Sequence, residues 1–304
     1  MKWLLLDAGN TALKWALVRA EQAQWSAGEF STTDPSLARR GGTLPLEHPD
    51  FRAQFERDLA QALALDPGGT KATAQGLKVL GSAVVAPETI FLVEDAIAAA
   101  VATTSPAGFA TAPRPAIQWL SAVERFEHDG ITLRNSYREP LLLGADRWHS
   151  MIGARALFPH VNLAVVNAGT ATTVDGVDMS GNFLGGVIAP GLELMRSSLA
   201  QAAARLPLAQ GEPVAHPDNT DDAIRTGITD ALVGLIEQRL RRIRERAGSP
   251  VQIVLSGGNR HALQPLLQAQ RGLGDVALDA ELVLRGVWHR ARALASAQIT
   301  SAPA

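Results

Sequence analysis

The sequence predicts two α/β lobes of the same kind, because a glycine-containing turn between two apolar strands occurs twice. The first copy, Asp7-Ala8-Gly9-Asn10-Thr11, follows the apolar run 3–6, and the second, Asn167-Ala168-Gly169-Thr170, follows the apolar run 163–166. Glycine lets a backbone approach a phosphate closely, and the hydroxyl and backbone N–H groups around it supply hydrogen-bond donors. Two such turns indicate a duplicated nucleotide-binding fold with ATP clamped between the halves.

Apolar periodicity places the elements of the first half. Leu13, Trp15 and Leu17 alternate with other residues, which predicts a strand over 11–18 that pairs with a strand over 4–7. Apolar residues at i+4 steps from Phe51 predict a helix that ends near 66–69. A strand over 78–82, a helix over 87–102, and loops over 31–50 and 105–115 complete this half.

The second half repeats this order. Strands are expected over 163–167, 172–177, 183–188 and 251–256, and helices from about Leu192, over 220–246 and over 281–297. Three strands followed by a helix in both halves favour two like lobes over a Rossmann sheet. Neither a G-x-G-x-x-G after a strand nor a G-x-x-x-x-G-K-[ST] occurs, so both of those nucleotide-binding folds lose their main support.

Composition limits the class of protein. The 304 residues are 46% hydrophobic and 19% charged, as is usual for a soluble globular enzyme. The net charge of -2 argues against nucleic acid as the main partner. The absence of cysteine excludes disulfides, Cys-ligated zinc and a thiol nucleophile, and it fits a cytoplasmic location. No run of about 18 apolar residues occurs, so no membrane span is expected.

The first turn carries the groups that bind a metal–phosphate complex. Asp7 is a candidate Mg²⁺ ligand, directly or through water, and Asn10, Thr11 and Lys14 are candidate contacts to phosphate oxygens. A plain β-hairpin turn is the alternative, because Gly-Asn is common in such turns. The second copy of the turn favours the phosphate interpretation. A third glycine-containing turn, with the pair Gly257-Gly258, follows an apolar strand and suits a loop on which an adenine ring lies.

A dense motif from Tyr137 to Arg147 lies near the middle of the chain. Its Asp146-Arg147 pair has two interpretations. A surface ion pair is the usual one, and the functional one is an Asp base that accepts a hydroxyl proton beside an Arg that holds phosphoryl charge. Five arginines between 239 and 246 indicate a solvated helix end, and the seven histidines show no metal-ligand spacing.

These motifs, in this order, resemble the type III pantothenate kinases, the family that includes the Bvg accessory factor proteins. The resemblance covers most of the chain, and the spacing from Tyr137 through Pro140 to Gly144-Ala145-Asp146-Arg147 is especially specific. It implies the fold of the acetate and sugar kinase/actin superfamily, with ribonuclease H-like lobes at 1–145 and 146–304. It also implies transfer of the ATP γ-phosphoryl group to the primary hydroxyl of pantothenate, the first step of coenzyme A synthesis.

The resemblance further implies a role for each matching residue. Asp146 is the proton acceptor, beside Arg147. The remaining groups are those for ATP (Asp7, Gly9, Asn10, Thr11, Lys14, Gly169, Thr170, Gly257, Gly258) and those for pantothenate (Tyr137, Gly144, Ala145, Asp146, Arg147, Thr220). Thr220 is expected to reach pantothenate across the interface of a homodimer. The cofactors implied are Mg²⁺ and a monovalent cation, K⁺ or NH₄⁺.

Two departures and two competing functions accompany this interpretation. Asn167 stands where the family has an Asp that ligates the monovalent cation, so a weak or absent cation requirement is expected. The loop over 32–50 is longer than the family pattern. A non-catalytic accessory protein with the same fold is the alternative function, and the retention of Asp7, Lys14, Asp146 and Arg147 favours the enzyme. A sugar or acetate kinase is disfavoured by the motif from Tyr137 to Arg147.

Overall fold

The computed structural model describes residues 2–19, 25, 40–64, 77–104, 114–203, 206–248, 250–270 and 272–300. Its contacts group the chain into two compact units. The first consists of Met1–Ala122, Gly144–His149 and Val283–Ala304, and the second of Val123–Leu143 and Ser150–Leu282. The lobe boundary expected between residues 145 and 146 stays a prediction.

A five-stranded sheet in the order β3-β2-β1-β4-β5 forms the centre of the first unit. The central strand β1 (Lys2–Ala8) pairs antiparallel with β2 (Ala12–Arg19) and parallel with β4 (Leu77–Ala83). The edge strands are β3 (Arg40–Pro45) and β5 (Ile117–Trp119). Helices α1 (Phe51–Ala64) and α2 (Pro87–Thr104) and, from Val283 on, α7 (Leu282–Thr300) complete this unit.

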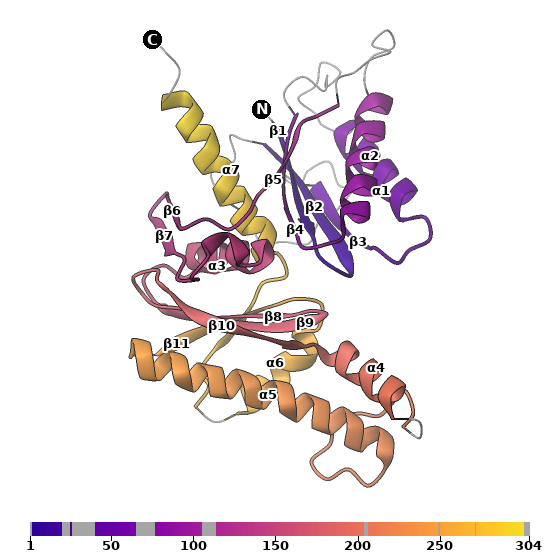
Figure 1. The fold of residues 1–304 in the computed structure, drawn as a ribbon, viewed down its shortest axis with the longest axis vertical. Coiled ribbons are helices and arrows are strands. Elements are labelled where there is room, and N and C mark those ends of the chain that lie inside the picture. Colours follow the sequence, from indigo (N-terminus) through magenta and orange to yellow (C-terminus); the bar gives the residue numbers. More distant parts are fainter. Residues whose placement is uncertain are drawn as a thin grey trace. The chain divides into compact units, whose positions relative to one another are not determined.

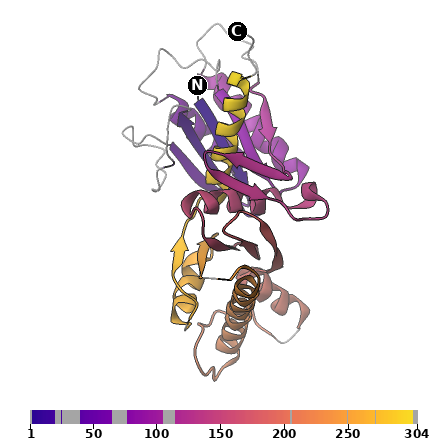
Figure 2. The ribbon, with the colours of Figure 1, turned by 90° about the vertical axis from the view of Figure 1, so that its left-hand side faces the viewer.

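The alternation of side chains along β1 explains why helices lie on both faces of this sheet. Leu4 and Leu6 pack with Phe55 of α1 in one buried cluster, whereas Trp3 and Leu5 pack with Trp288 of α7 in another. A strand that is apolar on both faces needs cover on both. Figures 1 and 2 show α1 and α2 on one side of the sheet and α7 along the other.

The second unit repeats this plan with the strand order β10-β9-β8-β11-β12. Its central strand β8 (Asn162–Ala168) pairs antiparallel with β9 (Ala171–Val177) and parallel with β11 (Val251–Ser256). The edge strands are β10 (Phe183–Pro190) and β12 (Val276–Leu278). The strand order and directions therefore agree between the two units, and the predicted duplication of α/β lobes is confirmed.

Three helices complete the second sheet. The helices α5 (Thr220–Ala247) and α6 (Arg260–Ala269) bury one apolar face together with β8 and β11, and α4 (Leu192–Ala202) follows β10. The side chain of Asn219 caps α5 by accepting a hydrogen bond from the N–H of Asp222. The remaining elements are β6 (Arg125–His128), β7 (Ile131–Arg134), the 3₁₀ helix η1 (Pro140–Leu142) and α3 (Ala145–Leu157).

Most expected strands and helices occur within a few residues of their predicted bounds, but the loop predicted over 31–50 is wrong for residues 40–45. These residues form β3, an edge strand whose Gly42 lies opposite Trp15. A Cβ on Gly42 would lie 3.1 Å from the fully buried Nε1 of Trp15, so the glycine makes room for the indole. Residues 46–50 belong to no strand or helix, as predicted, whereas residues 31–39, 65–70 and 105–113 lie outside the described residues.

Several elements were not predicted from the sequence, namely α3, α6, β5, β6, β7 and β12. Five of these are ten residues long or shorter, and α3 begins inside the Tyr137–Arg147 motif. Within the described part of the chain, no helix combines the length and the apolar character that crossing a membrane requires.

Candidate active site

The turn between β1 and β2 places Asp7 at the carboxyl end of the central strand of the first unit. Asp7 lies opposite Lys14 on the antiparallel neighbour β2 and opposite Ser82 on the parallel neighbour β4. The N–H of Gly9 donates to the carbonyl of Ala12 at 3.1 Å, which closes the turn. Asn10 and Thr11 are exposed at its tip, where their side chains and N–H groups can reach a ligand.

The carboxyl group of Asp7 is buried in a strongly perturbing environment. Its side chain is 7% exposed, and loss of hydration raises its pKa to about 6. The ammonium of Lys14 lowers this pKa and the negative charge of Asp146 raises it, so the two carboxylates lie within electrostatic reach of each other. The hydroxyl of Ser82 is buried, and it has no hydrogen-bond partner among the described residues.

The second carboxylate, Asp146, lies in the first turn of α3. A Cβ on Gly144 would come within 2.7 Å of Asp146 Oδ1, so glycine is the residue that leaves room for this carboxylate. Burial raises the pKa of Asp146, while the backbone N–H and the guanidinium of Arg147 lower it. Arg147 itself is 4% exposed. The surface ion pair considered from the sequence does not describe this buried arrangement.

A buried histidine follows the two candidate residues on the same helix. His149 is fully buried, and its Nδ1 lies 2.6 Å from the carbonyl of Ala145, so Nδ1 carries the proton. Burial and the charge of Arg290 lower the pKa of His149 to about 3. His149 is therefore neutral near pH 7, and no solvent reaches it, which leaves Asp146 as the base candidate of this helix.

Two glycine turns of the second unit are in direct contact. Gly257, between β11 and α6, has a φ of +94°, and a Cβ there would lie 2.4 Å from the carbonyl oxygen of Ala168. The N–H of Asn259 donates to that same carbonyl at 2.9 Å. The turn at Gly169 and Thr170 and the pair Gly257-Gly258 thus form one continuous backbone surface, with Thr170 exposed on it.

Asn167 is the penultimate residue of β8 in the second unit, as Asp7 is of β1 in the first. Its Nδ2 donates to the hydroxyl of Ser150 at 2.9 Å, and it lies opposite Thr173 on β9 and Ser256 on β11. The hydroxyl of Thr173 is buried and has no partner within the described ranges. The position therefore offers several neutral oxygens and no carboxylate from Asn167 itself.

The other two residues expected to bind pantothenate also lie in the second unit. The ring of Tyr137 stacks on the ring of Phe183, with centroids 5.8 Å apart. The backbone N–H of Tyr137 donates to the side-chain oxygen of Asn135 at 3.0 Å. Thr220 is the first residue of α5 and is exposed. Tyr137 is half-buried.

The comparison with protein families is decisive at this point. A family model described as type III pantothenate kinase matches residues 52–242. The chain is 38% identical over 289 residues to a type III pantothenate kinase of Laribacter hongkongensis, covering 95% of this chain and 98% of that one. It is 39% identical over 294 residues to a type III pantothenate kinase of Aromatoleum aromaticum, covering 97% and 99%.

The chain belongs to the type III pantothenate kinase family. It is therefore an enzyme of the phosphotransferase class. A solved structure with a similar fold is the activator of 2-hydroxyisocaproyl-CoA dehydratase from Clostridium difficile with bound ADPNP, at a TM-score of 0.52, with 11% identity and coverage of 100% and 99%. The fold is that of the acetate and sugar kinase/actin superfamily, with the two ribonuclease H-like lobes that were predicted.

Within each unit, the structure of this family member brings several predicted residues together. In the first unit, Asp7 lies opposite Lys14 and within electrostatic reach of Asp146, which neighbours Gly144 and Arg147. In the second, Gly169, Thr170, Gly257 and Gly258 share one surface, and Tyr137 and Thr220 lie on other elements. The buried hydroxyl of Ser82, which has no partner among the described residues, could not be given a role from the sequence.

Gly257 gives a direct test of the contact between the two glycine turns. We expect Gly257→Ala to lower the free energy of unfolding by about 2 kcal/mol and to raise the KM for ATP, because a Cβ at positive φ also meets the backbone of Ala168. Gly258→Ala is the matched control for stability alone, since nothing lies within 4 Å of its Cβ position. Denaturant unfolding and steady-state kinetics measure the two effects of Gly257→Ala, and equal unfolding free energies of the two variants would contradict the expectation.

Asp7 gives a pH-dependent test of burial. Its pKa is about 6 in the folded chain against 3.8 in the reference state, so the folded chain binds more protons in this window and loses stability as the pH rises through it. Asp7→Asn removes this loss. The unfolding free energy of the variant relative to wild type should therefore increase by roughly 2 kcal/mol from pH 4.5 to 7.5.

Denaturant titrations in EDTA at the two pH values measure this difference without a metal. Asp230→Asn, at an exposed position of α5, is the control and should show no such dependence. A difference between Asp7→Asn and wild type that stays constant with pH would mean that Asp7 ionises normally in the folded chain.

Proposed function

We propose that this chain transfers the γ-phosphoryl group of ATP to the primary hydroxyl of pantothenate and so begins coenzyme A synthesis. The observation that carries the proposal is the grouping of the buried Asp7 and the half-buried Asp146 with Lys14 and Arg147 in the first unit of a family member. Phosphoryl transfer asks a protein mainly to position groups and to neutralise charge, and these four side chains supply both.

Asp146 is the proposed general base. A carboxylate with an ordinary pKa is a weak base at neutral pH, and burial raises the pKa of Asp146 and so strengthens it. The N–H and guanidinium of Arg147 hold the carboxylate in its ionised form and keep that rise in check. In a loose transition state the hydroxyl proton leaves late, so moderate basicity is sufficient. Arg147 would also stabilise charge on the transferred group.

A Mg²⁺ ion fits the residues around Asp7. The carboxyl group of Asp7 is buried, the negative charge of Asp146 raises its pKa, and only Lys14 lowers it. A divalent cation at this position would stabilise the ionised form of Asp7. The buried hydroxyl of Ser82 offers a further oxygen, directly or through water. When bound, the ion would neutralise phosphate charge. Asp7 would hold it, and Lys14, Asn10, Thr11 and the N–H groups of the turn at Gly9 would bind phosphate oxygens.

In the second unit, the surface formed by Gly169, Thr170, Gly257 and Gly258 is the proposed contact to the rest of ATP. The close approach of the two turns leaves backbone N–H groups and the Thr170 hydroxyl at an exposed surface without bulky side chains. Tyr137, Gly144, Ala145, Asp146, Arg147 and Thr220 are the proposed contacts to pantothenate.

Self-association and location complete the proposal. We propose a homodimer in which Thr220 reaches the pantothenate of the partner subunit. Large exposed apolar side chains of the second unit support an interface there, among them Leu141, Leu142 and Ile188 at 72%, 70% and 63% exposure. A cytoplasmic location agrees with the absence of cysteine and with the substrates proposed. The non-catalytic alternative has no observation in its favour.

Replacement of the proposed base tests the mechanism. Asp146→Asn should lower kcat by at least roughly a hundredfold, the lower end of general-base contributions, while the fold stays intact. Steady-state phosphorylation of pantothenate with Mg·ATP measures this, and circular dichroism checks the fold. Asp230→Asn should behave as wild type, since it lies exposed on α5. An Asp146→Asn variant within a few-fold of wild type would exclude Asp146 as the base.

The residue at position 167 tests the monovalent cation. We expect the wild-type rate to depend weakly on K⁺ or NH₄⁺, because the amide of Asn167 attracts a cation less than a carboxylate does and its Nδ2 is already bonded to Ser150. Asn167→Asp should strengthen the dependence. Rates in KCl, NH₄Cl and NaCl at equal ionic strength measure it. A wild-type chain active only in K⁺ or NH₄⁺ would show that other oxygens, such as Thr173 Oγ1, complete a cation site.

A further inference from the structure

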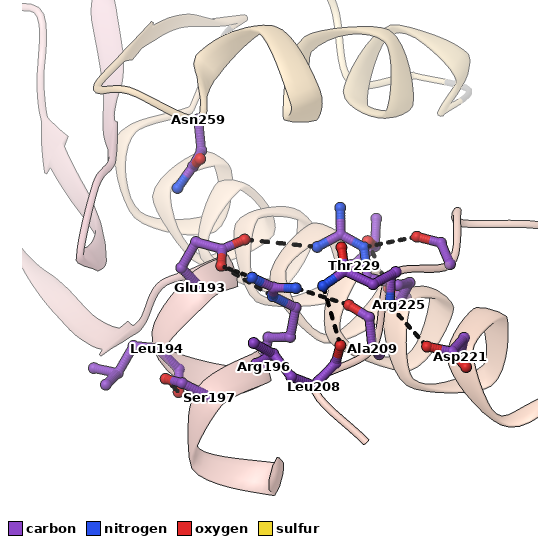
Figure 3. A network of polar contacts seen from close by, with 12 residues as sticks. Glu193, Leu194, Arg196, Ser197, Leu208, Ala209, Asp221, Arg225, Thr229 and Asn259 are labelled. Atoms are coloured by element: carbon purple, nitrogen blue, oxygen red, sulfur yellow. Dashed lines mark hydrogen bonds and ion pairs between the residues drawn. The ribbon is translucent and has the colours of Figure 1, made fainter. Parts of the chain in front are cut away.

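A single carboxylate joins two arginines on different helices of the second unit. Glu193, in the first turn of α4, accepts hydrogen bonds at Oε2 from Nε of Arg196 at 2.9 Å and from Nη2 of Arg196 at 2.6 Å. Its Oε1 lies 3.8 Å from Nη1 of Arg225 on α5. Figure 3 shows the carboxylate of Glu193 between the two guanidinium groups, on the side of the network that faces Asn259.

Both arginines also hold the segment that leads from α4 to α5. Arg196 Nη1 donates to the carbonyl of Ala209 at 2.8 Å, and Arg225 Nε donates to the carbonyl of Gly211 at 3.1 Å. The two guanidinium groups thus bind carbonyls only two residues apart in the chain. The position of residues 209–211 therefore depends on both helices together.

The same segment is bonded to the first turn of α5. The carboxylate of Asp221 accepts the N–H of Gln210 at 2.7 Å, and that of Asp222 accepts the N–H of Glu212 at 2.9 Å. A Cβ on Gly211 would lie 2.3 Å from Asp222 Oδ1, so the segment packs tightly against this turn. The first turn of α5, which begins at Thr220, is therefore linked to the segment by two hydrogen bonds.

The N-terminal end of α4, which carries Glu193, also contacts the turn proposed to bind ATP. The N–H of Gly191, the residue that precedes α4, donates to the carbonyl of Thr170 at 2.8 Å. A Cβ on Gly191 would lie 2.1 Å from the carbonyl oxygen of Gly169, so no larger residue fits this contact. The same end of α4 therefore contacts the turn through Gly191 and α5 through Glu193.

The charges make Glu193 the central member of this network. The side chains of Arg196 and Arg225 are only 17% and 21% exposed, whereas Glu193 is 60% exposed. Glu193 is the one carboxylate that contacts both guanidinium groups among the described residues. Removing its charge would leave two largely buried cations with carbonyl partners only, so the effect should exceed that of an ordinary surface ion pair.

We infer that Glu193 is a positioning residue for phosphoryl transfer, whose carboxylate fixes the first turn of α5, with Thr220, relative to the turn at Gly169 and Thr170. The inference rests on the proposed function, in which Thr170 contacts the ATP of its own chain and Thr220 contacts the pantothenate of the partner subunit. Glu193 is not among the proposed substrate contacts. It fixes the position from which Thr220 reaches the partner's substrate.

Glu193→Gln tests the inference, because it keeps the size of the side chain and removes its charge. We expect kcat/KM for pantothenate to fall about five- to tenfold, as two partly buried ion pairs are lost together. The KM for ATP should stay within about twofold, because the contact between Gly191 and Thr170 does not involve Glu193. A merely structural role would lower kcat/KM for pantothenate and raise the KM for ATP to a similar extent, and it would also lower the thermal midpoint.

Glu245→Gln is the matched control. Glu245 is 56% exposed, and it forms a single ion pair at 3.9 Å with Arg242 near the other end of α5. It should leave both kinetic parameters unchanged. Arg225→Gln should reproduce the loss, and the double variant Glu193→Gln/Arg225→Gln should lose less than the two single effects combined.

Each outcome decides the question. A selective loss for pantothenate in Glu193→Gln, with non-additivity in the double variant, supports the inference. Equal kinetics for Glu193→Gln and Glu245→Gln, or a rise in the KM for ATP that parallels the loss for pantothenate, overturns it and leaves the proposed function intact. A folded wild-type chain that transfers no phosphoryl group to pantothenate overturns the proposed function, and the inference falls with it.

Discussion

The burial of the Asp7 carboxyl group is the constraint on which the rest of the first unit's site depends. Asp7 ends the central strand of the sheet, so its neighbours are fixed by strand pairing: Lys14 from the antiparallel strand and Ser82 from the parallel one. Only Asp146 comes from a helix, and its negative charge raises the pKa of Asp7 further. The strand order thus gathers an acid, a cation and a hydroxyl at one edge, and α3 adds the second acid.

This arrangement opposes stability in the absence of a ligand. Burial is the largest cause that raises the pKa of both Asp7 and Asp146, so ionising either one in the folded chain costs free energy. The single ammonium of Lys14 does not offset the effect for Asp7, whose pKa stays about two units above its usual value. Such a cost in stability is typical of catalytic and ligand-binding residues, since an amide or an apolar side chain at that position would make the folded chain more stable.

The sequence predicted the parts of this site that local patterns determine. A period of two over residues 11–18 predicted the hairpin that sets Lys14 opposite Asp7. The pair Asp146-Arg147 could not be separated from a surface ion pair by local pattern, because its burial and its closeness to Asp7 arise only from the tertiary fold. Strand β3 was missed for a similar reason. Gly41-Gly42-Thr43 has a loop-like composition, and it is a strand because it pairs with β2, where Gly42 leaves room for Trp15.

The turns at Gly9 and Gly169 join corresponding strands of the two units, but they differ in charge, and this difference suits them to different ligands. The first turn follows an Asp and is close to a second carboxylate, so its field favours a cation. The second follows Asn167, whose amide is bonded to Ser150, and its surface is made of closely packed backbone around Gly169 and Gly257. A surface of N–H groups without a carboxylate favours an anion. The turn of the first unit is therefore suited to a cation and that of the second unit to an anion, and the neutral amide at position 167 contributes to this difference.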